Sequence, residues 1–223
     1  MVDPVVMQKY IKRLSKTFNP MFAYKRGIKW KQFEAAINKC LKPFSEHIMI
    51  NVKIKEDTEL EEDCFFLDGD YGARILGLNI KVEGYSPFEV VLPNIDSTIY
   101  TNGIDCVLPR KNFDLVLFCL ISHILHELVH FEQHKNADFG DISANYDIRG
   151  ITFNETSKRK LAAYLQEKDE MEAYSFNLFY EENSDMFADD ITPTTRIYES
   201  VFGPKSAVFQ KLRRKARRWK KRK

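Results

Sequence analysis

The segment from about residue 112 to residue 134 restricts the fold of this chain more than any other. Its first half, FDLVLFCLISHIL (113–125), carries apolar side chains on every side of a helix. A surface helix has one apolar stripe, whereas a helix that is apolar all round has to be buried. Asn112 is the predicted N-cap, and Asp114 suits the positive end of the helix dipole. The sequence therefore predicts one long helix in the core.

The second half of this predicted helix contains the pattern His126-Glu127-Leu128-Val129-His130. Residues four apart share a helix face, so both imidazoles can reach one zinc ion at about 2.0–2.1 Å. Glu127 can then take a proton from the water that zinc activates, because zinc lowers the pKa of that water from about 15.7 toward 7. A chance match to the pattern is the alternative, and the apolar surroundings of the motif favour a genuine zinc site.

Two histidines leave zinc one protein ligand short. His123 and His134 flank the motif, but a straight helix bends away from a single ion. A polar helix edge or a supporting hydrogen bond is therefore the favoured interpretation for both. The third histidine of the metzincin class is missing, because its position is Asn136.

A second long helix, predicted from about residue 156 to residue 180, carries Glu170 and Glu172. The pattern HELVH followed by a helix with Glu170 three residues before Ala173 resembles the minimal gluzincins. In that family the matching Glu is the third zinc ligand, which implies Glu170 here. Glu172 points about 200° away around the helix and is the weaker candidate.

The wider strings HELVHFEQ and AAYLQEKDEMEAYSFNLF are similar to small predicted metallopeptidases of bacteriophages and other viruses. The resemblance covers about residues 113–180. It implies an α+β, zincin-like fold, with a small, mostly antiparallel sheet, an active-site helix and a Glu-bearing helix. It also implies a peptide or protein substrate, which related enzymes bind along an edge strand; PFEVVLPN (87–94) is the candidate by its order in the chain.

The sequence departs from the larger gluzincins at Tyr174. Those enzymes place an Asp four residues after the ligand Glu, where it orients the first His. Tyr174, Tyr164 and His134 are the candidates for stabilising the transition state, and core packing or a solvated helix edge is the alternative for each.

The remaining patterns predict helices and strands around these two helices. Helices are expected at 4–17, at 29–41 and after residue 204, and strands at 47–57, 73–84 and 87–94. Asn19-Pro20 is expected to end the first helix, residues 96–110 to be irregular, and Pro193 to break the chain. We expect one zincin-like domain over 1–204, divided into a helical part (1–45), a sheet region (46–110) and the metal-binding helices (111–180), followed by a basic helical tail (205–223).

Charge is distributed unevenly along the chain. Ten of the 34 Lys and Arg fall in residues 211–223, which leaves 24 against 32 Asp and Glu in residues 1–210, a net charge of about −8. The tail is expected to bind a nucleic acid or another polyanion, or else to be a solvated helix end that aids solubility. The residues concerned are Arg213, Arg214, Lys215, Arg217 and Arg218.

The four cysteines form no CxxC pair and are expected to be reduced thiols. No uninterrupted apolar run reaches the roughly 18–20 residues of a transmembrane helix, and the first residues do not resemble a secretory signal. We expect an intracellular or virion-associated zinc metallopeptidase. The rivals are a zincin-fold structural or virion protein without turnover, and a nucleic-acid-binding protein that acts through its tail.

Overall fold

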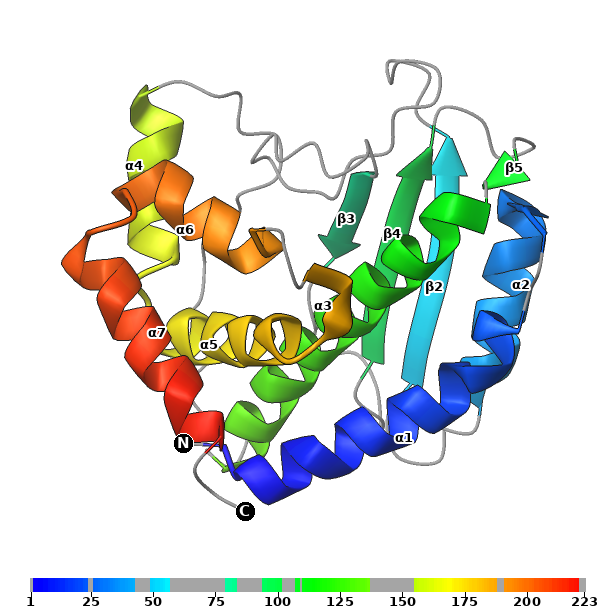
Figure 1. The fold of residues 1–223 in the computed structure, drawn as a ribbon, viewed down its shortest axis with the longest axis horizontal. Helices are drawn as coiled ribbons and strands as arrows, with labels where there is room; N and C mark the ends of the chain where they lie inside the picture. Colours follow the sequence, from blue (N-terminus) through cyan, green and yellow to red (C-terminus); the bar gives the residue numbers. More distant parts are fainter. Residues whose placement is uncertain are drawn as a thin grey trace. The chain divides into compact units, whose positions relative to one another are not determined.

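The computed structural model describes residues 2–23, 26–42, 49–56, 79–83, 94–101, 107–108, 110–136, 155–187 and 191–220 (Figure 1). These residues are mostly helical and include small sheets, as expected for an α+β chain. They form two compact units, one of residues 9–124 and one of residues 1–8 with 125–223. The prediction of a single domain over 1–204 stays a prediction.

The first unit contains a three-stranded sheet in the order β2-β4-β3. Strand β2 (Met49–Glu56) pairs in parallel with β4 (Asn94–Thr101), and β3 (Asn79–Glu83) pairs antiparallel with β4. The short β1 (Ile28–Lys29) and β5 (Val107–Leu108) form a separate antiparallel pair. The expected antiparallel character therefore holds for two pairings, whereas the longest one is parallel. Parallel strands need a long connection, and residues 57–93 separate β2 from β4.

Strand β4 corrects one prediction. Residues 96–110 were expected to be irregular, yet residues 94–101 form the central strand. Asp96, Ser97 and Thr98 obscure the alternation of apolar residues, but Ile99 is fully buried and Thr101 nearly so. Burial between two neighbouring strands thus outweighs weak local propensity. The strand expected at 87–94 lies outside the described residues, apart from its last residue.

Helix α2 (Trp30–Leu41) shields the edge of β2, and both elements match their predictions. The Asn38 side chain donates to the Val52 carbonyl at 2.7 Å and accepts from the Val52 amide at 2.9 Å. A Glu34 carboxylate oxygen accepts from the Ile54 amide at 2.6 Å. Unpaired backbone groups at a sheet edge otherwise invite strand pairing, so these contacts close this edge.

Helix α1 (Pro4–Phe22) continues past Asn19-Pro20, so the prediction that this step ends it was wrong. The helix runs only two residues beyond Pro20. Phe18 and Met21 are buried in this last turn, and their packing outweighs the hydrogen bond that proline cannot make.

Helix α3 (Arg110–Asn136) is the predicted core helix and begins two residues before Asn112. Its buried apolar residues are Phe113, Val116, Leu117, Phe118, Cys119, Leu120, Ile121, Ile124, Leu125, Leu128, Val129 and Phe131. By length and composition alone, Asn112–Gln133 is able to cross a membrane, which the search for an uninterrupted apolar run overlooked. However, 78% of this apolar segment is buried inside the protein, as in a core helix. Within the described residues, Cys40 and Cys119 form no disulfide, and Cys64 and Cys106 lie outside them.

The predicted helix over 156–180 is two helices, α4 (Glu155–Tyr164) and α5 (Lys168–Glu182). No Gly or Pro marks the break. Leu165 is fully buried there, and its carbonyl accepts a hydrogen bond from the Tyr198 hydroxyl at 2.9 Å. A partner outside the helix thus takes a carbonyl that a continuous helix would use internally.

Residue Pro193 starts a helix instead of breaking the chain. It is the first residue of α6 (Pro193–Phe202), and the Thr192 side chain caps this helix by accepting from the Thr195 amide at 3.2 Å. A threonine N-cap followed by proline is a helix-start signal that the sequence analysis missed. The short 3₁₀ helix η2 (Asp185–Phe187) precedes α6, and α7 (Ala207–Lys220) is the expected last helix.

We predict that Tyr198→Phe lowers the free energy of unfolding by about 1–3 kcal/mol, because the buried Leu165 carbonyl loses its partner while the ring is kept. Urea unfolding followed by circular dichroism measures this. Ser200→Ala removes an exposed hydroxyl from the same helix and is expected to change stability by less than about 0.5 kcal/mol. Equal stabilities of Tyr198→Phe and the wild type would contradict this role.

Candidate metal centre

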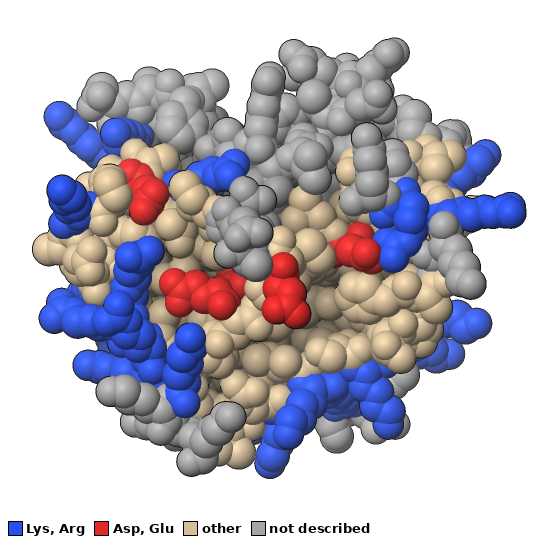
Figure 2. Space-filling model, viewed as in Figure 1, with Lys and Arg blue, Asp and Glu red and all other residues tan. Residues whose placement is uncertain are grey.

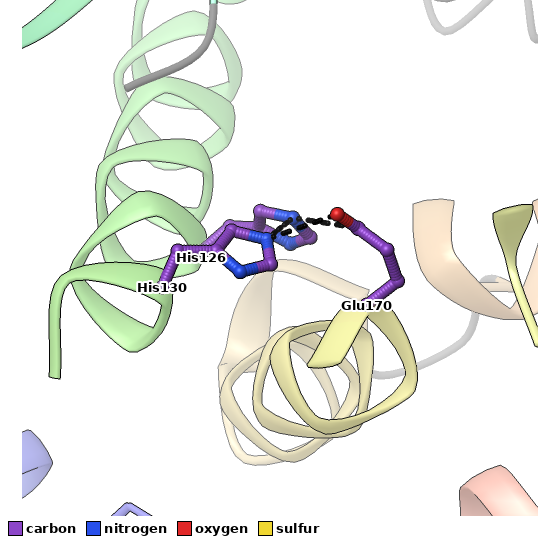
Figure 3. Close-up of side chains that lie close together, drawn as sticks. All are labelled: His126, His130 and Glu170. Atoms are coloured by element: carbon purple, nitrogen blue, oxygen red, sulfur yellow. Dashed lines mark hydrogen bonds and ion pairs between the residues drawn. The ribbon is translucent and has the colours of Figure 1, made fainter. Parts of the chain in front are cut away.

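Three side chains from two helices converge in the second unit (Figure 3). His126 and His130 extend from α3, and Glu170 extends from α5. The two Nε2 atoms lie 3.1 Å apart. One Glu170 oxygen lies 3.3 Å from Nε2 of His130, and the other lies 3.4 Å from Nε2 of His126. This group could hold a metal ion, since one ligand atom from each residue lies within 4.8 Å of the others.

The three side chains lie close enough together to share one metal ion. The two imidazole Nε2 atoms are 3.1 Å apart, and each of them has a different oxygen of Glu170 as its neighbour, at 3.4 Å for His126 and 3.3 Å for His130. An ion placed among them would need only small side-chain movements to bring one atom of each residue to the usual distance of about 2.0–2.2 Å. The donor set of two imidazole nitrogens and one carboxylate is also one that zinc accepts.

The local sequence explains how each ligand reaches this point. The four-residue spacing places both histidines on one face of α3. The break at residues 165–167 puts Glu170 in the first turn of α5, where the helix dipole favours a carboxylate. Ala173, one turn later, is fully buried, and its small side chain suits close packing of α5. All three ligand candidates are largely shielded from solvent.

Gln133 fixes the orientation of His130. Its amide nitrogen donates to the Asp169 backbone carbonyl at 3.0 Å, an acceptor only. The amide oxygen therefore faces Nδ1 of His130, 2.8 Å away, and accepts its proton. With the proton on Nδ1, the lone pair of neutral His130 lies on Nε2, toward Glu170. Such supporting hydrogen bonds raise the affinity of a ligand histidine for metal.

Glu172 lies outside the ligand group. One carboxylate oxygen accepts from the buried Val2 amide at 3.0 Å, and the other accepts from Gln133 at 3.4 Å. The geometry thus separates the two glutamates as the sequence analysis expected, with Glu170 on the side of the histidines.

The site without metal is strongly polarised. Burial disfavours a charged His130, but the nearby Glu170 and Glu127 carboxylates outweigh it and raise the pKa of His130 from 6.5 to about 9. Burial likewise opposes ionisation of Glu170, yet the two histidines hold the pKa of its carboxyl well below its usual range. The pair therefore carries a proton at neutral pH that a metal ion has to displace.

The other predicted site residues have different outcomes. Glu127 is buried and lies within electrostatic reach of His130. The Tyr174 ring meets the His126 ring edge-on, with centroids 4.7 Å apart. The pKa of the Tyr164 phenol is raised well above 10, and burial is the largest cause. The nearby Tyr174 and a hydrogen bond to Glu170 add to this shift. His134 belongs to α3, but its side chain lies outside what the structure describes.

Sequence analysis missed the roles of Gln133 and Glu172. The spacing of Gln133, three residues after His130, was an available signal, because such residues are neighbours on a helix. Its second partner, Asp169, is 36 residues away and gave no local signal.

The comparisons with known proteins add nothing to the geometry of this site. No family model matches the chain, and no similar protein was found among the curated proteins or the solved structures.

We predict that Gln133→Leu weakens zinc binding about 10- to 100-fold, because His130 loses the acceptor that fixes its tautomer. Competition with a chromogenic chelator measures the affinity. Gln166→Leu is the matched control, because Gln166 makes an exposed contact to the Ala162 carbonyl away from the ligand group, and it should bind as tightly as the wild type. Equal affinities for both variants would contradict the orienting role.

The raised pKa of His130 predicts a pH dependence of metal binding. Below pH 9 the proton on His130 competes with the metal, so the apparent zinc affinity should rise about tenfold per pH unit from pH 6.5 to 8.5. The same competition, corrected for the titration of the chelator, tests this. An affinity that levels off above pH 7 would show an ordinary histidine pKa.

Proposed function

We propose that this chain is a zinc-dependent metallopeptidase of the minimal gluzincin type. The observation that carries the proposal is the convergence of His126, His130 and Glu170, whose nearest nitrogen and oxygen atoms are 3.1 to 3.4 Å apart. Two imidazoles and one carboxylate match the ligand set of zinc peptidases. The resemblance of HELVH and of the Glu170 segment to viral metallopeptidases supports the same reaction.

The number of ligands favours catalysis over a structural role. Structural zinc sites are usually closed by four protein ligands, whereas catalytic sites use three and keep one position for water or substrate. The described residues supply three. Glu127 argues in the same direction, because a structural site needs no buried carboxylate directly after its first ligand.

The reaction follows from the roles of the side chains. His126, His130 and Glu170 would hold the zinc ion, which would supply a Lewis acid able to polarise the scissile carbonyl and to lower the pKa of a water toward 7. Glu127 accepts the proton of the attacking water and then donates it to the leaving amine, so the nitrogen departs neutral and the carboxylate is restored. Gln133 holds His130 in the ligating tautomer. Tyr164 hydrogen-bonds the Glu170 carboxylate and is suited to orient this ligand.

We predict that Glu127→Gln retains one zinc per chain but cleaves peptides about 10²- to 10⁴-fold more slowly, because the general base is lost. Elemental analysis gives the zinc content. Cleavage of fluorescein-labelled casein and of a peptide library, read by mass spectrometry, gives the activity.

Two further variants separate the glutamates. Glu170→Gln is expected to lose both zinc and activity, whereas Glu172→Gln, its neighbour on α5, is expected to keep zinc. A zinc-loaded wild type that cleaves nothing would favour a zincin-fold structural protein. Unchanged cleavage by Glu127→Gln would refute the mechanism.

A further inference from the structure

The basic segment at the end of the chain is a docked helix and not a free tail. Four apolar residues of α7 are buried, namely Phe209, Leu212, Ala216 and Trp219. The Trp219 indole donates to the Ser175 hydroxyl on α5 at 3.0 Å, and its ring meets Phe176 edge-on at 4.8 Å. Since α7 is amphipathic, packing its apolar face on α5 leaves its cationic face toward solvent.

The side of α7 that faces away from α5 is rich in positive charge. The exposed cations of this helix are Lys211, Arg214, Arg217, Arg218 and Lys220. The helix contains no acidic residue. In the part of the chain that the structure describes, no ion pair engages these five side chains. Figure 2 shows Lys and Arg gathered over α7, at the lower left of the view.

Two other cations of α7 are turned partly inward. The Arg213 guanidinium lies over the Phe209 ring, 4.7 Å from its centroid. Partial burial lowers the pKa of Lys215; Glu172 opposes the shift, and Lys211, Arg218 and Lys168 add to it. The electrostatic influence of three cations on Lys215 shows how closely positive charge is gathered here. Of the residues predicted to bind a polyanion, Arg214, Arg217 and Arg218 are therefore the ones fully available.

The buried apolar face argues against two kinds of partner. A helix that binds a membrane surface inserts its apolar side between the lipids, but α7 has that side packed on α5. A protein that binds single strands stacks bases on exposed aromatic rings, but Trp219 and Phe209 are both buried. What remains accessible is charge and guanidinium hydrogen bonding.

Charge density distinguishes the remaining partners. Residues 211–220 span about 14 Å at 1.5 Å per residue. Duplex DNA carries one phosphate charge per about 1.7 Å of axis when both strands are counted, so a duplex of this length has about eight around its circumference. An extended acidic peptide places side chains on one face about every 6.6 Å, which gives about two charges. Guanidinium groups also match phosphate oxygens in bidentate geometry.

We propose that the exposed face of α7 binds the phosphodiester backbone of a nucleic-acid duplex without reading its bases. The proposal is independent of the zinc site, because none of the five exposed cations belongs to it. DNA and RNA duplexes share the phosphate chemistry, and parallel measurements on the two distinguish them.

The test is fluorescence anisotropy of the full chain with a labelled 20-base-pair DNA duplex and an RNA duplex, from 50 to 200 mM KCl. If all five exposed cations meet phosphates, log K should fall against log salt with a slope of about −4.5, a loss of about 500-fold. Replacing Arg214, Arg217 and Arg218 by Gln should reduce the slope to about −1.8 and weaken binding at 50 mM by more than about tenfold.

The control removes three charges from another exposed helix face, with Lys9, Lys12 and Lys16 of α1 replaced by Gln. It should bind as the wild type does. Replacing the three arginines by Lys should keep the slope, and thermal melting shows whether each variant is folded. Unchanged duplex binding by the folded Arg-to-Gln variant would overturn the proposal. So would a wild type that ignores both duplexes but binds poly-glutamate or phosphatidylserine vesicles.

Discussion

Two imidazole nitrogens and a carboxylate face one another at 3.1 to 3.4 Å, and all three side chains are largely buried. Two neutral imidazoles that both present lone pairs, next to a carboxylate, repel one another unless a positive charge lies among them. A proton on His130 supplies that charge in the protein without metal, and the raised pKa of His130 reflects it. A divalent cation would satisfy all three groups at once, because each residue offers one ligand atom within 4.8 Å of the others. A positive charge at this point would therefore stabilise the convergence of these side chains from α3 and α5.

Helix α5 contributes both to the candidate metal centre and to the packing of α7. Its first turn presents Glu170 to the histidines, and Glu172 in the same turn accepts hydrogen bonds from Val2 and Gln133. Farther along, Ser175 accepts from Trp219 and donates to the Glu172 carbonyl at 2.7 Å, which joins the α7 anchor to the turn that holds the metal candidate. A substitution in α7 that disturbs the contacts of Trp219 is therefore expected to affect α5. The exposed cations of α7 are not part of these contacts.

The sequence predicted the elements whose signals are local. The all-round apolar pattern of α3, the alternation in β2 and the amphipathic α2 and α7 each lie within one short segment, and the structure has them close to the expected bounds. The break between α4 and α5 could not be predicted, because it depends on Tyr198, 33 residues from Leu165. The parallel pairing of β2 with β4 is likewise non-local. The start of α6 at Thr192-Pro193 was predictable in principle and was missed.

The candidate site divides in the same way. The pair His126 and His130 follows from helical spacing, and Glu170 from the resemblance to gluzincins. The hydrogen bonds that hold Gln133 and Glu172 arise only when α3, α5 and the N-terminal segment come together, so the sequence alone did not reveal them. The helix break also supports Glu170 as a ligand, because it places this residue in the N-terminal turn of α5. No sequence pattern contained this information.

X-ray absorption at the zinc edge of the zinc-loaded protein tests the central claim most directly. We predict one zinc per chain, four-coordinate, with two imidazole nitrogens at about 2.0–2.1 Å, oxygen ligands at about 2.0–2.2 Å and no sulfur. The Glu170→Gln variant should lose this spectrum. Sulfur at about 2.3 Å, a shell of oxygen alone, or correctly folded protein that takes up no zinc would contradict the account.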